Sequence, residues 1–389
     1  MRQLFGCAIV MMLLLGPAAI GAEIVVPYAP PSPEHSLPAF IGPHTVGVRS
    51  FAWIDESRLE EASPQEGDYR EVVVQIWYPA MVDGVDRTAL YMPELQEMLS
   101  ASEHLTQGEK NFVKVHEVLR NTATNSVPGA KILELAQPWP VILFSPGGNV
   151  SRHSQTALAE RLASRGFVFV SMSHPYSTMD VAPTSGFSMS IDWGLDQKDD
   201  RAALESDNRL AEILAGDAAF VLRQLRELAE NGGPFGRALN LRQIGIAGHS
   251  RGGTTVGRAC ALRPDIVACA VIDNIGPDRE RETGIRPPFT TLRSSWNEER
   301  IAILHDYLKR TGSVAYDIEL ADSNHFTCTD LPLFMHDLRV DGIEPIDGID
   351  ACAKILSSFF DAHLRRRIAT EDDSWLSAIR SDKVRITKF

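Results

Sequence analysis

The arrangement of apolar positions along the chain predicts a series of buried strands. Short runs that are apolar at every or nearly every position are typical of strands covered on both faces, as in a parallel sheet. Such runs occupy residues 141–144, 244–247 and 266–272. Further strands are expected at residues 45–53, 71–78, 167–171, 289–293 and 314–320, the second of these stopping at Pro79.

Segments with both apolar and polar positions separate these strands and predict helices. The longest is an amphipathic stretch at residues 208–230, which ends at a Gly-Gly-Pro sequence. Other helices are expected at residues 156–164, 254–262, 297–309 and 351–365. Strands that alternate with helices predict an α/β fold with a mostly parallel central sheet. The right-handed crossover rule then places helices on both faces of that sheet.

The first 22 residues have the pattern of a signal peptide. Arg2 supplies a positive start, Ala8–Leu15 forms an apolar core, and small residues lead to a cleavage site before Glu23. The apolar run is too short for a comfortable membrane span. We therefore expect an exported protein, periplasmic or secreted, with no stable membrane span.

The remainder is expected to form a single domain at residues 45–389. A proline-rich segment at residues 23–44 precedes it, and is predicted to lie along the domain as an extended arm or to be a loose leader. Lid-like insertions interrupt the domain at about residues 83–137 and 174–207. The first insertion is expected to contain helical stretches at residues 91–99 and 109–119.

Composition and charge narrow the classes of function. The 389 residues carry 38 basic and 51 acidic side chains, a formal net charge of −13. Such an acidic chain is a poor match for nucleic acid or for an anionic membrane surface. No group of histidines and carboxylates has the spacing of metal ligands, and the cysteines lack C-x-x-C spacing. We expect no metal, no cofactor and no nucleic-acid partner, and the oligomeric state is left open.

Four cysteines remain once the signal segment is removed: Cys260, Cys269, Cys328 and Cys352. An even number in an exported protein suggests disulfides. Their order along the chain favours Cys260–Cys269 and Cys328–Cys352, although three connectivities are possible. The alternative is that some of them are buried thiols, which behave as small apolar side chains.

Ser250 is the strongest candidate for a catalytic residue. It lies in Gly248-His249-Ser250-Arg251-Gly252, directly after the predicted strand 244–247 and before the predicted helix 254–262. A G-x-S-x-G sequence between a strand and a helix is the nucleophile elbow, a tight turn that exposes the serine hydroxyl. The alternative is a glycine-rich surface turn.

A nucleophilic serine needs a histidine as base and an acid that orients this histidine. In α/β-hydrolases both follow the serine in the order acid, then histidine. Asp273 directly follows the strand 266–272, and His325 follows the last predicted strand, so these two are the expected partners. The other acids considered are Asp278, Asp317 and Asp322, and the other histidines are His305, His336 and His363.

The oxyanion hole of such a site requires two backbone amides. One is expected from Arg251, the residue after the nucleophile. The other is expected from Gly148, in the glycine-containing loop after the strand 141–144, with Gly147 or Asn149 as alternatives. The competing interpretation of this loop is a plain turn between a strand and a helix.

Taken together, several segments resemble the platelet-activating factor acetylhydrolase-like group of α/β-hydrolases. These segments are Gln75–Ala80, Pro140–Gly147, Leu162–Val168, Gly248–Gly253, Asn324–Phe326 and Asp330–Pro332. The resemblance implies an α/β-hydrolase fold, Ser250, Asp273 and His325 as the catalytic triad, and Gly148 and Arg251 as oxyanion donors. The group often has His-Gly where this chain has Pro146-Gly147, and an aromatic or aliphatic residue where it has Arg251.

The expected activity is that of an exported serine carboxylic-ester hydrolase on a small-molecule ester or lipid. The resemblance implies short acyl esters or phospholipid-derived esters as substrates. The alternatives are a polyester or cutinase-like hydrolase, a serine peptidase or amidase on the same fold, and a binding module without activity. Within the second insertion, the apolar Phe187 and Trp193 are expected to line the acyl pocket, or else to pack the insertion onto the domain.

Overall fold

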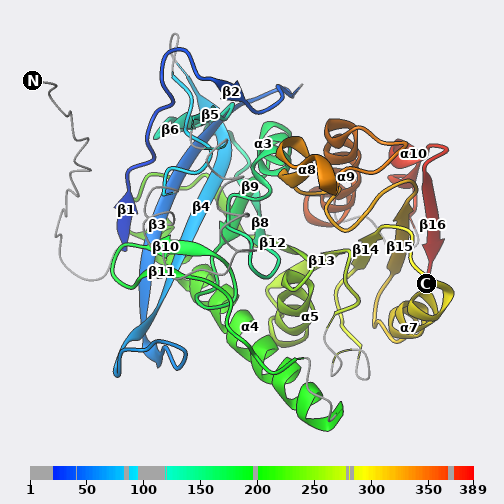
Figure 1. The fold of residues 1–389 in the computed structure, drawn as a ribbon. Helices are drawn as coiled ribbons and strands as arrows, with labels where there is room; N and C mark the ends of the chain where they lie inside the picture. Colours follow the sequence, from blue (N-terminus) through cyan, green and yellow to red (C-terminus); the bar gives the residue numbers. More distant parts are fainter. Residues whose placement is uncertain are drawn as a thin grey trace, which may run out of the picture.

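A large central sheet organises the molecule (Figure 1). The computed structural model describes residues 21–40, 42–82, 87–94, 119, 121–195, 200–276, 280, 284–366 and 372–389. Among these residues the sheet has 12 strands, most of them in the spatial order β1-β3-β4-β9-β8-β12-β13-β14-β15-β16. In chain order their bounds are β1 Ala22–Ile24, β3 Thr45–Leu59, β4 Tyr69–Met81, β8 Trp139–Ser145, β9 Val168–Met172, β12 Leu239–His249, β13 Ile266–Ile272, β14 Phe289–Arg293, β15 Ala315–Leu320 and β16 Val384–Lys388.

The middle of the sheet is parallel and its two sides are antiparallel. Neighbouring strands are parallel from β9 through β8, β12, β13 and β14 to β15. The strands β1, β3 and β4 on one side and β16 on the other are antiparallel to their neighbours. This confirms the predicted α/β architecture with a mostly parallel sheet. Because parallel strands end on the same edge, the loops after β8, β12, β13 and β15 can meet there.

Helices cover both faces of the sheet (Figure 1). One layer comprises α3 Thr156–Ser164, α8 Leu331–Phe334, α9 Pro345–Phe360 and α10 Leu376–Ile379, and the other comprises α4 Asp200–Glu230, α5 Gly252–Leu262 and α7 Glu298–Lys309. The two layers create two hydrophobic cores, and strand β8 shows how the sheet serves both. Val141 and Leu143 point into one core, while Ile142 and Phe144 point into the other. This two-sided burial explains why β8 is apolar without alternation.

Short strands attach the segments outside the regular alternation. In the proline-rich segment, β1 pairs with β3, and β2 (His35–Ser36) pairs with β5 (Thr122–Ala123). In the first insertion, β6 (Val127–Pro128) and β7 (Lys131–Ile132) pair with β3 and β4. The helical stretches expected at 91–99 and 109–119 lie largely outside the described residues, as does the signal segment before residue 21.

The second insertion contains more regular structure than a polar loop. A small antiparallel hairpin is formed by β10 (Asp180–Ala182) and β11 (Gly186–Ser188). The helix expected to begin at Asn208 begins at Asp200 instead. Its added first turns are rich in residues with good helix propensity, such as alanine, leucine and glutamate, but they lack an apolar stripe. The pattern of hydrophobic residues therefore did not predict these first turns of α4.

Among the other differences from the sequence-based expectations are two element boundaries and one additional strand. Strand β4 continues through Pro79 to Met81, beyond Trp77, the last residue that pairs with β9, so the missing N–H of proline breaks no hydrogen bond with that strand. The C-terminal helix begins at Pro345 and passes into a π-helix at Asp361–Arg366 rather than spanning 351–365 as one helix. Strand β16, at the exposed edge, was not expected. Within the described part of the chain, no helix is long and apolar enough to cross a membrane.

Candidate active site

Ser250 occupies a strained turn between β12 and α5. Its φ angle is 53°, in the left-handed region that few residues other than glycine adopt. The flanking glycines are required by close packing: a Cβ atom on Gly248 would collide with the carbonyl of Gly252, and one on Gly252 would collide with the carbonyl of Ser145. The Ser250 amide donates a hydrogen bond of 2.9 Å to the carbonyl of Ile272. This local geometry is that of a nucleophile elbow.

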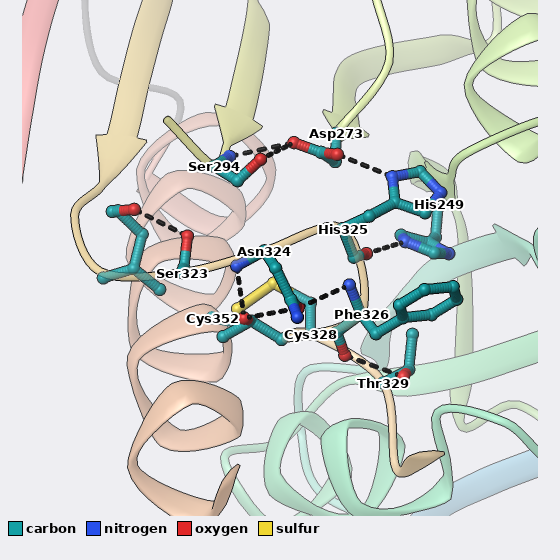
Figure 2. The surroundings of a disulfide bond; sticks show 12 residues. His249, Asp273, Ser294, Ser323, Asn324, His325, Phe326, Cys328, Thr329 and Cys352 are labelled. Atoms are coloured by element: carbon teal, nitrogen blue, oxygen red, sulfur yellow. Dashed lines mark hydrogen bonds and ion pairs between the residues drawn. A yellow bond between two sulfur atoms is a disulfide. The ribbon is translucent and has the colours of Figure 1, made fainter. Parts of the chain in front are cut away.

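Asp273 and His325 meet at the end of the sheet that carries the elbow (Figure 2). Asp273 directly follows β13, and its Oδ2 lies 2.6 Å from Nδ1 of His325. Its Oδ1 accepts hydrogen bonds from the amide and the hydroxyl of Ser294, at 2.9 and 2.7 Å, and from the indole of Trp296 at 2.8 Å. Burial opposes ionisation, but the hydrogen bonds from His325 and Ser294 outweigh it and lower the pKa of Asp273 below its usual value. The carboxylate is therefore charged and fixed in place.

His325 is tied to the elbow through His249, the residue before Ser250. The Nε2 atom of His249 lies 2.6 Å from the carbonyl oxygen of His325, and the two rings lie 4.7 Å apart between centroids. Burial, followed by the charge of His325, lowers the pKa of His249 to about 4. A neutral His249 thus donates a hydrogen bond from Nε2 to the backbone of the loop that carries His325 (Figure 2). No hydrogen bond joins Ser250 to His325 among the described residues, and such contacts often shorten only when substrate binds.

With Nδ1 facing Asp273, Nε2 is the basic nitrogen of His325. A carboxylate can only accept hydrogen bonds, so the proton on the imidazole must lie on Nδ1. The His325 side chain is 38% exposed, whereas that of Asp273 is only 5% exposed. The imidazole can therefore exchange a proton with a bound molecule while its orienting carboxylate stays buried.

The loop after β8 lies against the elbow. A Cβ atom on Gly147 would lie 3.3 Å from the Cβ of Ser250, and one on Gly148 would lie 2.7 Å from Cζ of Arg251. Asn149 has a φ angle of 58°, and its amide donates a 3.0 Å hydrogen bond to the carbonyl of Ser177. Because that amide is already engaged, Asn149 is a poor oxyanion donor. The assignment of Gly148 and Arg251 as the oxyanion donors stays a prediction.

The second insertion lies over this loop. The guanidinium of Arg251 donates a 2.7 Å hydrogen bond to the hydroxyl of Ser190, and the Ser190 amide donates to Oδ1 of Asn149 at 3.0 Å. Phe187, on β11, is partly buried against the core. The indole of Trp193 donates a 2.8 Å hydrogen bond to the carbonyl of Tyr176. Both aromatic residues thus belong to a segment anchored beside Ser250, and their role as pocket walls stays a prediction.

Several of the other acids and histidines that the sequence offered have structural partners. Asp317 pairs with Arg293 and with His305, each at 2.8 Å, and Asp322 lies 3.6 Å from Lys383 at the surface. His336 lies in a short 3-10 helix at His336–Leu338, and His363 lies in the π-helix, packed against Phe359 and Trp375. Asp278 lies outside the described residues.

Ser294 and Trp296, which donate hydrogen bonds to Asp273, were not predicted from the sequence. Ser294 directly follows β14, the strand next to β13 in the sheet, and Trp296 comes two residues later. The signal for them was their position at the carboxyl end of a strand adjacent to the one that carries the acid. A polar residue at that place is within reach of the acid, but the sequence alone did not order β13 and β14 as neighbours.

Both expected cysteine pairs are joined. Cys260–Cys269 links α5 to β13, and Cys328–Cys352 links the segment after His325 to α9 (Figure 2). Beside the second disulfide, a small cavity of about 10 Å³ is lined by residues that include Asp273, Ser294 and His325. A cavity of this size holds a single water molecule at most. In the described residues, no group of three or more histidines, cysteines or carboxylates could hold a metal ion.

Comparison with known proteins agrees with this geometry. Residues 140–339, more than half of the chain, match the family model described as alpha/beta hydrolase fold, and the chain belongs to that family. Residues 30–181 match a second model, described as platelet-activating factor acetylhydrolase, isoform II. The resemblance seen in the sequence motifs is thereby confirmed.

Two individual proteins are similar to this chain. A probable 1-alkyl-2-acetylglycerophosphocholine esterase of Arthroderma benhamiae is 32% identical over 117 residues, which are 30% of this chain and 26% of that protein. The match therefore spans about a quarter of the length of this relative. The solved structure of a ferulic acid esterase from Streptomyces cinnamoneus has a TM-score of 0.72 and 22% identity, covering 90% of this chain and 99% of that one. At that identity the likeness concerns the fold.

Proposed function

We propose that this protein is a serine carboxylic-ester hydrolase that works through an acyl-enzyme. The observation that carries the proposal is the 2.6 Å contact between Asp273 and His325 beside the strained Ser250 elbow. The family models and the names of the similar proteins support ester hydrolysis as the reaction class. Ser250 is the nucleophile, His325 the base and Asp273 the orienting acid.

The reaction proceeds in two halves that use the same proton carrier. His325 Nε2 takes the proton of the Ser250 hydroxyl as its oxygen bonds to the ester carbonyl carbon, giving a tetrahedral oxyanion. When this intermediate collapses, the bond to the alcohol breaks, and the leaving alkoxide takes the proton from His325. A water molecule then gives a proton to His325 as its oxygen bonds to the acyl carbon. When this second intermediate collapses, the bond to Ser250 Oγ breaks, the serine oxygen takes the proton back from His325, and the acid is released.

The oxyanion is stabilised by the amides of Gly148 and Arg251. These residues lie on the two loops that converge at Ser250, and Arg251 is at the N-terminus of α5, where the helix dipole favours negative charge. Removal of one such donor typically costs about 3 kcal/mol of transition-state stabilisation.

The substrates that fit this proposal are short acyl esters, including esters derived from phospholipids. The names of the matching family and of the curated relative support this class. We further propose that the protein is exported after removal of residues 1–22, which agrees with its two disulfides. Phe187 and Trp193 are proposed to set the preferred acyl length, because their segment is fixed next to Arg251 and Asn149.

The test is a comparison of wild type with Ser250→Ala on p-nitrophenyl acetate, longer p-nitrophenyl esters and a p-nitroanilide. Wild type should hydrolyse the acetate much faster than the anilide, and the variant should lose about 10⁴-fold or more in rate while keeping the wild-type circular dichroism spectrum. Faster turnover of the anilide would favour a peptidase or amidase. Activity retained in the variant would remove Ser250 from the mechanism.

Acyl length is tested with the same ester panel on Phe187→Ala combined with Trp193→Ala. The double variant should shift the preferred chain length and keep its turnover of the acetate, because the catalytic groups lie elsewhere. An unchanged length profile in the folded double variant would assign both residues to packing of the insertion.

A further inference from the structure

A second serine, histidine and aspartate form a hydrogen-bonded chain in the interior, next to the elbow. Ser145 Oγ lies 2.8 Å from Nε2 of His174, and Nδ1 of His174 lies 2.8 Å from Oδ2 of Asp217. None of the three residues is more than 1% exposed. They repeat the connectivity of a catalytic triad, but no substrate can reach them.

This buried chain joins four elements that surround the active site. Ser145 is the last residue of β8, His174 follows β9, and Asp217 lies on α4. The Ser145 hydroxyl is also 2.9 Å from the hydroxyl of Thr255, on the helix that follows the nucleophile. Ser145 itself is paired with Gly248 in the register of β8 and β12, two residues before Ser250.

The charges around Asp217 determine the protonation state of His174. The carboxylate of Asp217 receives two hydrogen bonds from Arg70, at 2.6 and 2.7 Å, and one from Arg58 at 2.8 Å. Burial lowers the pKa of His174, and the charges of Arg70 and Arg58 add to this effect against the pull of Asp217. The imidazole is therefore neutral, with its proton on Nδ1 toward Asp217 and Nε2 as the acceptor for Ser145.

The loop at residues 146–149 is held at both ends by hydrogen bonds that lead to His174. It begins directly after Ser145, whose side chain is bound to His174. At its other end, the amide of Asn149 donates to the carbonyl of Ser177, and the amides of Ser177 and Thr178 donate to the carbonyl of His174 at 2.9 Å each. His174 is thus linked indirectly to both ends of the loop, through its ring and Ser145 at one end and through its backbone carbonyl and Ser177 at the other.

We propose that His174 is a positioning residue, which through Ser145 holds the 146–149 loop in place relative to Ser250 and so aligns the amide of Gly148 with the oxyanion. This inference rests on the proposed esterase function, because it concerns the oxyanion loop of that reaction. Misplacement of a catalytic group by about 1 Å can cost on the order of 100-fold in rate. The hydrogen bonds of His174 act on geometry, whereas His325 acts on the proton.

The test uses Ser145→Ala, His174→Asn and His174→Gln in the full-length protein. Asparagine keeps a donor where Nδ1 faces Asp217 but cannot reach Ser145, whereas glutamine carries an amide group near the position of Nε2. We expect kcat to fall about 10- to 100-fold in Ser145→Ala and His174→Asn, with KM changed less than about threefold, and to recover several-fold in His174→Gln. Ser50→Ala is the control, since it also removes a buried hydroxyl, bound to the Val74 carbonyl at 2.9 Å on β3, and should keep wild-type kcat.

Two measurements separate positioning from a loss of folded protein. The kcat is expressed per site titrated with a fluorophosphonate, and the affinity for a trifluoromethyl ketone, which forms an oxyanion when bound, should weaken in step with kcat/KM. A kcat per titrated site within about twofold of wild type would overturn the inference, even if the melting temperature falls. If His174→Asn does not fold, Ser145→Ala decides alone. A wild type that neither reacts with the fluorophosphonate nor hydrolyses esters would overturn the proposed function as well, and the two failures are thereby distinguished.

Discussion

Two sets of serine, histidine and aspartate lie side by side in this molecule, and their surroundings give them opposite properties. In one set, His325 is 38% exposed and its carboxylate partner is held by neutral donors, Ser294 and Trp296. In the other, His174 is buried and its carboxylate partner is bound by two arginines. The first arrangement leaves a basic nitrogen that can accept a proton from a bound group. The second locks a neutral ring in one orientation.

The comparison shows that residue types and a short contact between aspartate and histidine do not by themselves define a catalytic triad. Both sets have a short contact from the aspartate to Nδ1, 2.6 Å for His325 and 2.8 Å for His174. The two serines differ as well. Ser250 stands in a turn with a positive φ angle, whereas Ser145 is fully buried at the end of a regular strand. Exposure of the serine and of Nε2 decides which set can carry out chemistry.

The largest expected effect comes from Asp273, the carboxylate of the set that contains Ser250 and His325. Asp273→Asn should lower kcat/KM for p-nitrophenyl acetate by about 10⁴-fold, because the amide favours the wrong tautomer of His325, while the melting temperature changes little. Asp322→Asn is the matched control, since Asp322 also follows a strand and has a positive φ angle, which asparagine tolerates. It should stay within about twofold of wild type. A larger loss of kcat/KM in Asp322→Asn than in Asp273→Asn would show that Asp273 is not the orienting acid.

Asp217, the carboxylate of the set that contains Ser145 and His174, should contribute mainly to the free energy of unfolding. Asp217→Asn leaves the buried guanidinium of Arg70 without one of its two anionic partners, and removal of one member of a buried ion pair costs about 3–5 kcal/mol of unfolding free energy. Urea denaturation measures this loss. Asp306→Asn, which breaks an exposed pair with Arg310, should cost less than about 1 kcal/mol. Equal losses in the two variants would contradict the buried, charged state of Asp217.

A smaller effect concerns pH. The folded pKa of His174 lies below the usual 6.5, so the unfolded chain binds this proton first as the pH falls below about 6.5. Stability from this group is therefore complete above pH 6.5 and is lost on acidification, with a slope of at most about 1.4 kcal/mol per pH unit. In His174→Asn, the unfolding free energy should fall less steeply with decreasing pH than in wild type. Parallel slopes would show that His174 binds a proton in the folded protein.

Much of the exposed site could be predicted from sequence, because each of its parts follows a strand. Ser250, Asp273 and His325 each come directly or shortly after a strand that the apolar pattern reveals, and parallel strands end on one edge. The cysteine pairs were favoured by the expected export and by the order of the cysteines along the chain. The predicted boundaries at Pro79 and Asn208 were wrong, because strand pairing and helix propensity, rather than apolar periodicity, set the observed ones.

The buried set could not be predicted from sequence. Asp217 lies within the amphipathic helix α4, where a carboxylate usually faces solvent, and His174 lies in a polar segment that was expected to be a loop. Only the packing of α4 against the sheet brings Asp217 to Arg70 on β4, 147 residues earlier in the chain. Such long-range contacts between buried polar groups leave no periodic signal.

The most direct test of the difference between the two sets is the site of covalent labelling. The native wild-type protein is treated with a fluorophosphonate, digested, and the modified peptide is sequenced by mass spectrometry. We predict one adduct per chain, on Ser250, and an unmodified Ser145. An adduct on Ser145, or a modified peptide that contains neither serine, would contradict it.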